Sequence, residues 1–149
     1  LIVRGICVLI PGIPGVSDNI TVRSIVGRFL EHSRIFWFRN GGREELYISS
    51  ADWMPRNLND RVELMVPIED PEIKRRLKQM VDIELSDNQK AHIMQADGTW
   101  LKTISAENQL CAQEYFQKIA EKRDAEDEMT LAQKLEPYTP VLGHGDGSD

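Results

Sequence analysis

His32-Ser33-Arg34-Ile35-Phe36-Trp37-Phe38-Arg39-Asn40 is the stretch that decides the fold, because it has the composition of a single β-strand. Three aromatic residues and an isoleucine favour extended structure, and Asn40-Gly41-Gly42 is a turn signal at its end. Side chains alternate along a strand, so His32 and Arg34 are predicted to point to the same face. An imidazole beside a guanidinium packs poorly in a core, whereas both groups bind oxyanions well.

A second run, residues 45–58, begins as a strand and ends in a polar corner. The polar residues of this corner are Ser49, Ser50, Asp52, Arg56 and Asn57. Together the two runs predict a phosphate-binding site at the carboxyl-terminal edges of neighbouring strands. We expect Arg56 to face phosphate and Asp52 to orient a neighbouring side chain, while Trp53 and Met54 are expected to pack in the core.

The composition is that of one soluble globular domain, with 149 residues, 41% of them hydrophobic and 28% charged. The net charge of -6 is unevenly spread, because residues 1–43 contain six arginines and two acidic residues. A positive front half on an acidic chain predicts a local anion site and no nucleic-acid surface. The first lysine is Lys74, and the arginines before it suit bidentate phosphate binding, although codon or surface bias also explains such a pattern.

Targeting and redox features are sparse. The chain has no apolar run of about 18 residues, which predicts no transmembrane helix. Residues 1–16 are apolar but are interrupted by prolines and glycines and lack a basic start, so we expect no signal peptide and interpret the chain as a piece of something longer. Cys7 and Cys111 show no metal-ligand spacing and are predicted to be reduced core thiols in the cytoplasm.

The remaining elements follow from local patterns. Strands are predicted over 1–10, 20–26 and 62–68, with a turn or a single helical turn over 27–31. Asp70-Pro71-Glu72 predicts the start of a helix that runs to about residue 85, and Asp97-Gly98 predicts a hairpin between 91–95 and 99–103. A last helix is expected over 106–123, capped by Ser105.

These elements predict an α/β (α+β) fold. Residues 1–123 are expected to form the domain, and residues 124–149 a weakly ordered tail with one short helix near 129–135.

Arg4 and His32 are the two candidates whose roles the pattern leaves open. A buried guanidinium in the first strand needs either a carboxylate partner or an anionic ligand, and both interpretations of Arg4 stand. His32 is the only histidine at a plausible site, since His92 lies in a surface strand and His144 in the tail. A lone histidine is often structural, but His32 shares its face with Arg34, which favours a role in phosphate chemistry.

Four motifs carry a family resemblance: Ile2-Val3-Arg4-Gly5-Ile6-Cys7, Pro11-Gly12-Ile13-Pro14-Gly15-Val16-Ser17, residues 22–34, and Ser50-Ala51-Asp52-Trp53-Met54-Pro55-Arg56-Asn57-Leu58. Over residues 1–121 the chain resembles the C-terminal catalytic domain of bacterial polyphosphate kinases. The resemblance implies a phospholipase D-like mixed β-sheet flanked by helices. Hydrolases of that superfamily have a lysine where this chain has Arg34, and their sites combine two histidines from two half-domains.

The resemblance also implies an activity. The family transfers the γ-phosphate of ATP to a histidine in a preceding domain, absent here, and then reversibly to inorganic polyphosphate. Arg4 matches the family's nucleotide-contacting arginine and His32 its second active-site histidine, with Arg34 and Arg56 as further phosphate-binding candidates. Mg²⁺ is expected with ATP, held by residues upstream, so that no metal ligand is assigned here.

The implied partners are ATP and ADP, inorganic polyphosphate, the preceding catalytic domain and further copies of the chain. The implied location is the cytoplasm, with peripheral membrane association, and the segment alone is expected to be inactive. Two alternatives remain: a phospholipase D-like phosphodiesterase half-domain, and a non-catalytic module that binds polyanions.

Overall fold

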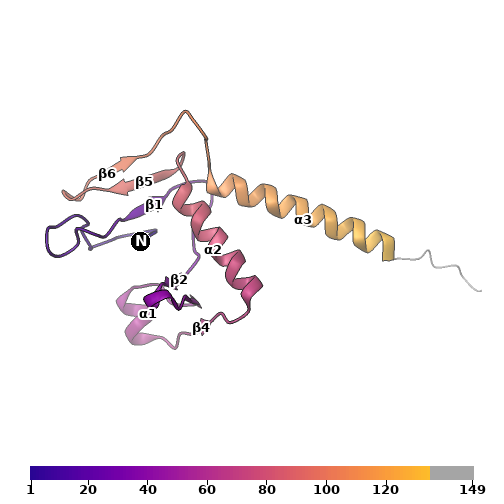
Figure 1. Cartoon of the computed structure of the whole chain (residues 1–149), viewed down its shortest axis with the longest axis horizontal. Coiled ribbons are helices and arrows are strands. Elements are labelled where there is room, and N and C mark those ends of the chain that lie inside the picture. The colour runs from indigo at the N-terminus through magenta and orange to yellow at the C-terminus, as the bar shows by residue number, and fades with distance from the viewer. Residues whose placement is uncertain (135–149) are drawn as a thin grey trace, which may run out of the picture. The chain divides into compact units, whose positions relative to one another are not determined.

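The computed structural model describes residues 1–134, with side chains through residue 125. Residues Leu1–Tyr115 form one compact unit, and a second unit begins at Phe116. Within the described part, the chain contains both strands and helices, interspersed along its length, which confirms the predicted α/β (α+β) class. The strands are divided between two small antiparallel sheets instead of being gathered into one mixed sheet (Figure 1).

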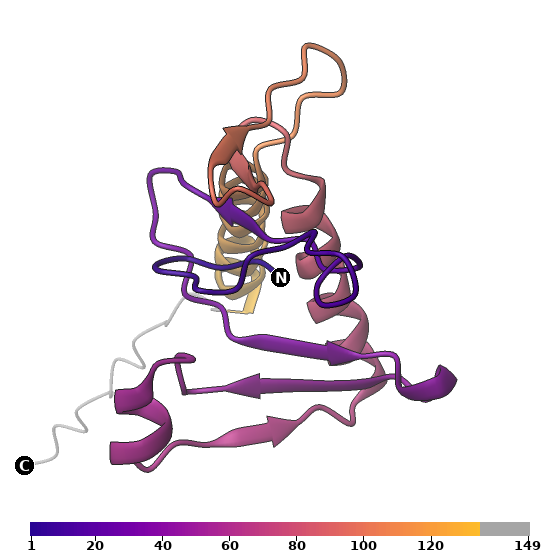
Figure 2. The ribbon, with the colours of Figure 1, turned by 90° about the vertical axis from the view of Figure 1, so that its left-hand side faces the viewer.

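The sheet that bears the predicted site has the order β2-β3-β4. Its strands are β2 (Ile35–Phe38), β3 (Glu45–Ser49) and β4 (Met65–Pro67), which run side by side in Figure 2. Ile35 lies opposite Ile48 in the β2–β3 pair. A 3-10 helix, Asn40–Gly42, joins the two strands, and both glycines have positive φ (63° and 98°), which explains the turn signal.

The other sheet has the order β1-β5-β6 and contains the most deeply buried residues. Its strands are β1 (Arg23–Ile25), β5 (Ala91–Met94) and β6 (Trp100–Lys102). Val22, Ile25 and Ala91 are buried almost completely. The Asp97-Gly98 hairpin is confirmed, because Gln95 N donates to Thr99 O (2.8 Å) and Gly98 N to Gln95 O (2.9 Å).

Helix α2 (Pro71–Ser86) begins where the sequence predicts. The Asp70 side chain accepts hydrogen bonds from the backbone N–H groups of Glu72 and Ile73, both 2.9 Å. At the other end, Arg23 Nη1 from β1 donates to the carbonyls of Glu84 (3.2 Å) and Leu85. A cation at the carbonyl end of a helix satisfies groups that have no intrahelical partner.

Helix α2 also packs on the sheet that bears the site. The Lys78 ammonium lies 4.5 Å from the centre of the Trp37 ring in β2. The same ammonium pairs with the Glu44 carboxylate at 2.8 Å. These contacts attach α2 to β2 and to the residue that precedes β3.

The prediction of a buried strand over residues 1–10 is wrong. The backbone near Leu1 pairs with Arg23 through two hydrogen bonds, Val3 N to Arg23 O (2.8 Å) and Arg23 N to Leu1 O (2.9 Å), and then diverges. Ile6 is 100% exposed and Val8 93% exposed. An apolar strand is buried only when neighbours cover it, and the described chain supplies one bridge partner. Arg4 is consequently exposed, not buried.

The start of the last helix is also wrong. Helix α3 spans Ala112–Lys134, and Ser105 does not cap it. Its first N–H, on Ala112, donates to Asp87 Oδ2 at 2.8 Å, so the cap comes from a residue 25 positions away. The helix continues past the predicted boundary at Arg123. The rest of the predicted tail, 135–149, including His144, lies outside the described residues, so the domain boundary stays a prediction.

The two cysteines, Cys7 and Cys111, are free within the described part of the chain, and both are half-buried. The prediction that they lie in the core is therefore wrong, and their redox state stays a prediction.

Candidate functional site

A polar cluster lies where β2 begins and β3 ends. His32 and Arg34 precede β2, and Asp52 follows β3, with α1 (Pro55–Asp60) after it. Ser49 N donates to Arg34 O at 3.0 Å, which extends the β2–β3 pairing by one residue. The predicted placement at two carboxyl-terminal edges is wrong, because the turn at 40–42 makes the strands antiparallel and brings the start of one beside the end of the other.

The side chains of His32, Arg34 and Asp52 contact one another directly, and the alternation argument for His32 and Arg34 is confirmed. Arg34 Nη2 lies 2.6 Å from His32 Nε2, and Arg34 Nε donates to Asp52 Oδ1 at 2.7 Å. His32 Nε2 lies 3.6 Å from the same carboxylate oxygen. Asp52 thus orients Arg34, as predicted, and Arg34 in turn touches the imidazole.

The electrostatics of this trio follow from these contacts. The hydrogen bond from Arg34 holds the pKa of Asp52 below its usual value, and the charges of Arg34 and Arg56 act in the same direction against partial desolvation. An arginine only donates, so His32 Nε2 accepts here and the ring proton is assigned to Nδ1. The His32 side chain is 60% exposed, compared with 22% for Arg34. The imidazole is therefore open to a ligand, while its two supports are fixed behind it.

A second carboxylate, Glu63, organises the rest of the corner. Asn57 Nδ2 donates to Glu63 Oε1 at 2.8 Å, and Ser50 Oγ donates to Glu63 Oε2. These hydrogen bonds, with the charges of Arg61 and Arg34, lower the pKa of Glu63. Sequence reasoning missed this residue, although an acid inside the apolar run 62–66 was the available signal. Glu63 gives Ser50 and Asn57, which belong to one of the family motifs, a structural role as its hydrogen-bond donors.

Arg56 and Arg4 differ in their relation to the trio. Arg56 lies on exposed α1, close enough to Asp52 to act on its carboxylate. Arg4 has no hydrogen bond or ion pair with the trio within the described residues. The expectation that Trp53 and Met54 pack in the core is wrong: Trp53 is 74% exposed and stacks one face on Phe36 at 5.6 Å between ring centres, and Met54 is also exposed.

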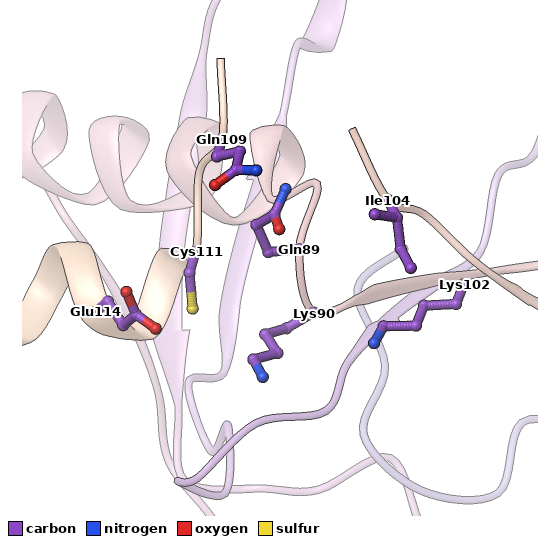
Figure 3. Close-up of a pocket in the computed structure, with 7 residues that line it drawn as sticks. All are labelled: Gln89, Lys90, Lys102, Ile104, Gln109, Cys111 and Glu114. Atoms are coloured by element: carbon purple, nitrogen blue, oxygen red, sulfur yellow. The ribbon is translucent and has the colours of Figure 1, made fainter. Parts of the chain in front are cut away.

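A cavity of about 360 Å³ lies elsewhere, beside the β5–β6 hairpin. Figure 3 shows its lining residues: Gln89, Lys90, Lys102, Ile104, Gln109, Cys111 and Glu114. It contains none of the site residues that the sequence predicts. The residues that the sequence predicts for the site therefore lie in the trio, apart from this cavity.

Neither a metal cluster nor a membrane helix is found in residues 1–134. No group of three or more His, Cys, Asp or Glu side chains is arranged there to hold a metal ion. No helix of the same region is long and apolar enough to cross a membrane.

Together with Arg56, the trio can bind an oxyanion. Two arginines and an imidazole around one fixed carboxylate offer donors on the solvent side, and guanidinium groups neutralise charge on a phosphoryl group. The imidazole can accept or donate a proton at the same place.

Comparison with known proteins identifies similar sequences and one matching family model. Residues 1–113 match the family model described as polyphosphate kinase C-terminal domain 2. The chain is 54% identical over 125 residues to a polyphosphate kinase of Synechocystis sp. and 56% identical over 109 residues to one of Pseudomonas aeruginosa. These alignments cover 81% and 73% of this chain but only 17% and 16% of those proteins.

A solved structure is also similar, the crystal structure of polyphosphate kinase from Porphyromonas gingivalis. It superposes with a TM-score of 0.75 at 40% identity, covering 84% of this chain and 19% of that protein. The chain therefore spans about a fifth or less of the length of the relatives it matches.

Proposed function

The chain belongs to the polyphosphate kinase family as a segment of its C-terminal domain, and from this premise we propose that it supplies one half of a phosphoryl-transfer site. The reaction is the reversible transfer of the γ-phosphoryl group of ATP to inorganic polyphosphate through a phosphohistidine on a preceding domain. The observation that supports this proposal most is the Asp52–Arg34–His32 relay, in which a carboxylate fixes an arginine beside an exposed imidazole.

In each of the two transfers one bond to phosphorus forms and one breaks, and no electrons are exchanged with another molecule. In the first, the histidine nitrogen of the preceding domain forms a bond to the γ-phosphorus, and the bond from that phosphorus to the bridging oxygen of ADP breaks. In the second, a terminal oxygen of polyphosphate attacks the same phosphorus, and the nitrogen–phosphorus bond breaks. Charge stays on the phosphoryl oxygens in both, which is where arginines are most effective.

Each residue of the trio has a distinct role in this proposal. Arg34 contacts a phosphoryl oxygen while Asp52 holds its Nε side. His32 donates a hydrogen bond or a proton to the phosphate oxygens that carry the developing charge. Arg56, exposed on α1, contributes a further positive charge, and Arg4 contacts the nucleotide, as the family resemblance implies.

The remaining components come from outside the described residues. Mg²⁺ would arrive with ATP and neutralise its phosphates. Asp52 and Glu63 are already engaged by arginine, serine and asparagine donors, so we assign no metal ligand in this segment. The preceding catalytic domain and further copies of the chain are the expected protein partners. ATP as the donor also favours a cytoplasmic location.

The decisive experiment measures transfer against hydrolysis. The full-length protein is incubated with γ-labelled ATP and short polyphosphate, and label in polymer, free phosphate and protein-bound phosphohistidine is separated. The proposal expects label in polymer and, on adding ADP, its return to ATP. Cleavage of a phosphodiester substrate instead would identify a phospholipase D-like hydrolase. Polyphosphate binding with steep salt dependence but no transfer would identify a polyanion-binding module.

A further inference from the structure

His32 lies at the end of a connection, residues 27–32, that has no regular secondary structure. β1 ends at Ile25 and β2 begins at Ile35, and the residues between them form bends and extended backbone. Of the two predicted alternatives for 27–31, a turn or a single helical turn, the helical turn is not formed, and the backbone bends at 27–29. Phe29 and Leu30 are exposed, so apolar packing does not hold this connection in place. Another interaction must fix the backbone that carries the imidazole.

Gln113, the second residue of α3, supplies that interaction. Its Oε1 accepts from Phe29 N at 3.0 Å, and its Nε2 donates to Phe29 O at 2.7 Å. The side-chain amide therefore pairs with one residue of the connection as a neighbouring strand would. Nε2 also donates to Glu31 Oε1 at 2.7 Å, directly before His32. Gln113 is 7% exposed, and both ends of its amide are in use.

The space around Gly27 is independent evidence for the close contact between this connection and the Gln113 side-chain amide. A Cβ atom at position 27 would lie 2.2 Å from Gln113 Oε1 and 2.8 Å from Gln113 Cδ. Contacts this short do not occur, so a larger residue would push the amide away from Phe29. A larger residue fits at position 27 only if the Gln113 amide moves. Residues 27–29 and Gln113 at the start of α3 are thus complementary in shape and in hydrogen bonding.

We propose that Gln113 is a positioning residue for His32: it clamps residues 27–31 so that the imidazole stays beside Arg34 and Asp52. The inference rests on the proposed function for its kinetic consequence, but the clamp itself stands on geometry. The chemistry stays with the trio at the other end of the connection, since Gln113 touches none of its side chains within the described structure. Displacement of reacting groups by about 1 Å can lower a rate by about 100-fold.

The test uses the full-length protein and the variants Gln113→Leu, Gln113→Ala and Gly27→Ala. Gln117→Leu is the matched control, because Gln117 is an exposed glutamine on the same helix that bonds only Glu121 in the described structure. Two readouts are taken: the kcat and KM for ATP, and the rate at which diethylpyrocarbonate modifies His32, followed by peptide mass spectrometry. The second readout needs no activity and separates failure of the clamp from failure of the proposed function.

We expect Gln113→Leu to lower kcat about 10- to 100-fold with KM changed less than about threefold. We also expect modification of His32 to become several-fold faster, because the Arg34 contact that covers Nε2 loosens. Gly27→Ala should do the same in the parent protein but add nothing in the Gln113→Ala background, where the clashing amide is gone. Such non-additivity is the mark of two residues that act as one unit.

Equal effects of Gly27→Ala in both backgrounds would overturn the proposal. So would a His32 modification rate in Gln113→Leu that matches the Gln117→Leu control. If Gln113→Leu lowers the melting temperature strongly, Gly27→Ala decides the question, because it removes no side chain and acts only by displacing the Gln113 amide.

Discussion

At the scale of single residues, the contact with Arg34 determines which nitrogen of the His32 ring carries the proton. Arg34 Nε donates a hydrogen bond to Asp52 Oδ1 at 2.7 Å. This orients the guanidinium so that Arg34 Nη2 lies 2.6 Å from His32 Nε2. A phosphate oxygen that reaches Arg34 competes with His32 Nε2 for this donor. In the proposed function, binding of phosphate at Arg34 would therefore release His32 Nε2, which could then take up or share a proton.

Substitution of His32 separates a chemical role from a structural one. In the full-length protein, His32→Gln keeps the size and one hydrogen bond but cannot carry the proton, so polymer synthesis should fall by about 10² to 10⁴-fold. His32→Ala should fall at least as far, and both should melt near wild type because the side chain is mostly exposed. The half-buried His92 is the control, and His92→Gln should retain activity. Near-normal turnover of His32→Gln would end the assignment.

Glu84 makes stability depend on pH. Burial, and then repulsion from Glu31, raises its pKa from 4.5 to about 7. Between these two values the folded state binds more protons than the unfolded state, so the free energy of unfolding falls as pH rises and levels off above about pH 7. The contribution is on the order of 1 to 3 kcal/mol.

Chemical denaturation at pH 5 and pH 8 measures this slope. Glu84→Gln keeps a neutral side chain of similar shape at every pH, so it should flatten the dependence and raise stability at pH 8. Glu107→Gln removes an exposed carboxylate and should leave the slope unchanged. An unchanged slope in Glu84→Gln would show that Glu84 is not the group that titrates.

At the scale of elements, Asp87 joins helix α2, strand β5 and helix α3. Its Oδ1 accepts from the N–H groups of Gln89 (3.0 Å), Lys90 (2.7 Å) and Ala91 (3.1 Å). Its Oδ2 accepts from Ala112 N at 2.8 Å. Four donors compensate for burying a carboxylate, which would otherwise be unfavourable.

Removal of that carboxylate should be the most destabilising polar substitution in the described unit. Asp87→Ala leaves four backbone donors without this acceptor, at a cost on the order of 3 to 5 kcal/mol. Asp87→Asn keeps one oxygen and should cost less. Urea denaturation measures both, with Asp82→Asn, an exposed aspartate of α2, as the control. A loss below about 1 kcal/mol for Asp87→Ala would mean that water replaces the carboxylate.

The elements also show which structural features the sequence could predict. The Asp70 cap and the Asp97-Gly98 turn are confirmed because the residues that cause them lie within three positions of one another. The His32–Arg34 pair is confirmed for the same reason, since strand alternation is local. The start of α3 was missed because its cap, Asp87, is 25 residues away. The Gln113 contact with Phe29 joins residues 84 positions apart, so no local sequence pattern predicts it.

At the scale of the whole molecule, the unexplained feature is exposed apolar surface. Ile6, Val8 and Val62 are almost fully exposed, although the run 1–10 has the composition of a buried strand. Isolated exposed apolar residues are ordinary, but a continuous run is typical of an interface. The relatives are about six times longer than the aligned segment, so in those proteins further chain is available to cover the corresponding run.

Ile6→Ser tests whether the rest of a full-length protein covers this run. In the 149-residue chain, the substitution should leave the unfolding midpoint unchanged, because a fully exposed side chain loses no burial. In the full-length protein it should cost about 1.5 to 3 kcal/mol, the transfer free energy of one large buried apolar side chain. Val22→Ser, at a position with no exposed surface, should destabilise both chains and serves as the positive control for the measurement.

If Ile6→Ser changes the stability of neither chain, residues 1–10 lie on the surface of the full-length protein as well, and their apolar character has another cause. If it destabilises both equally, the run already packs within the 149 residues. Loss in the full-length protein alone would show that residues 1–10 acquire their sheet neighbours from outside this segment, which is the reason the strand pattern in the sequence is not realised here.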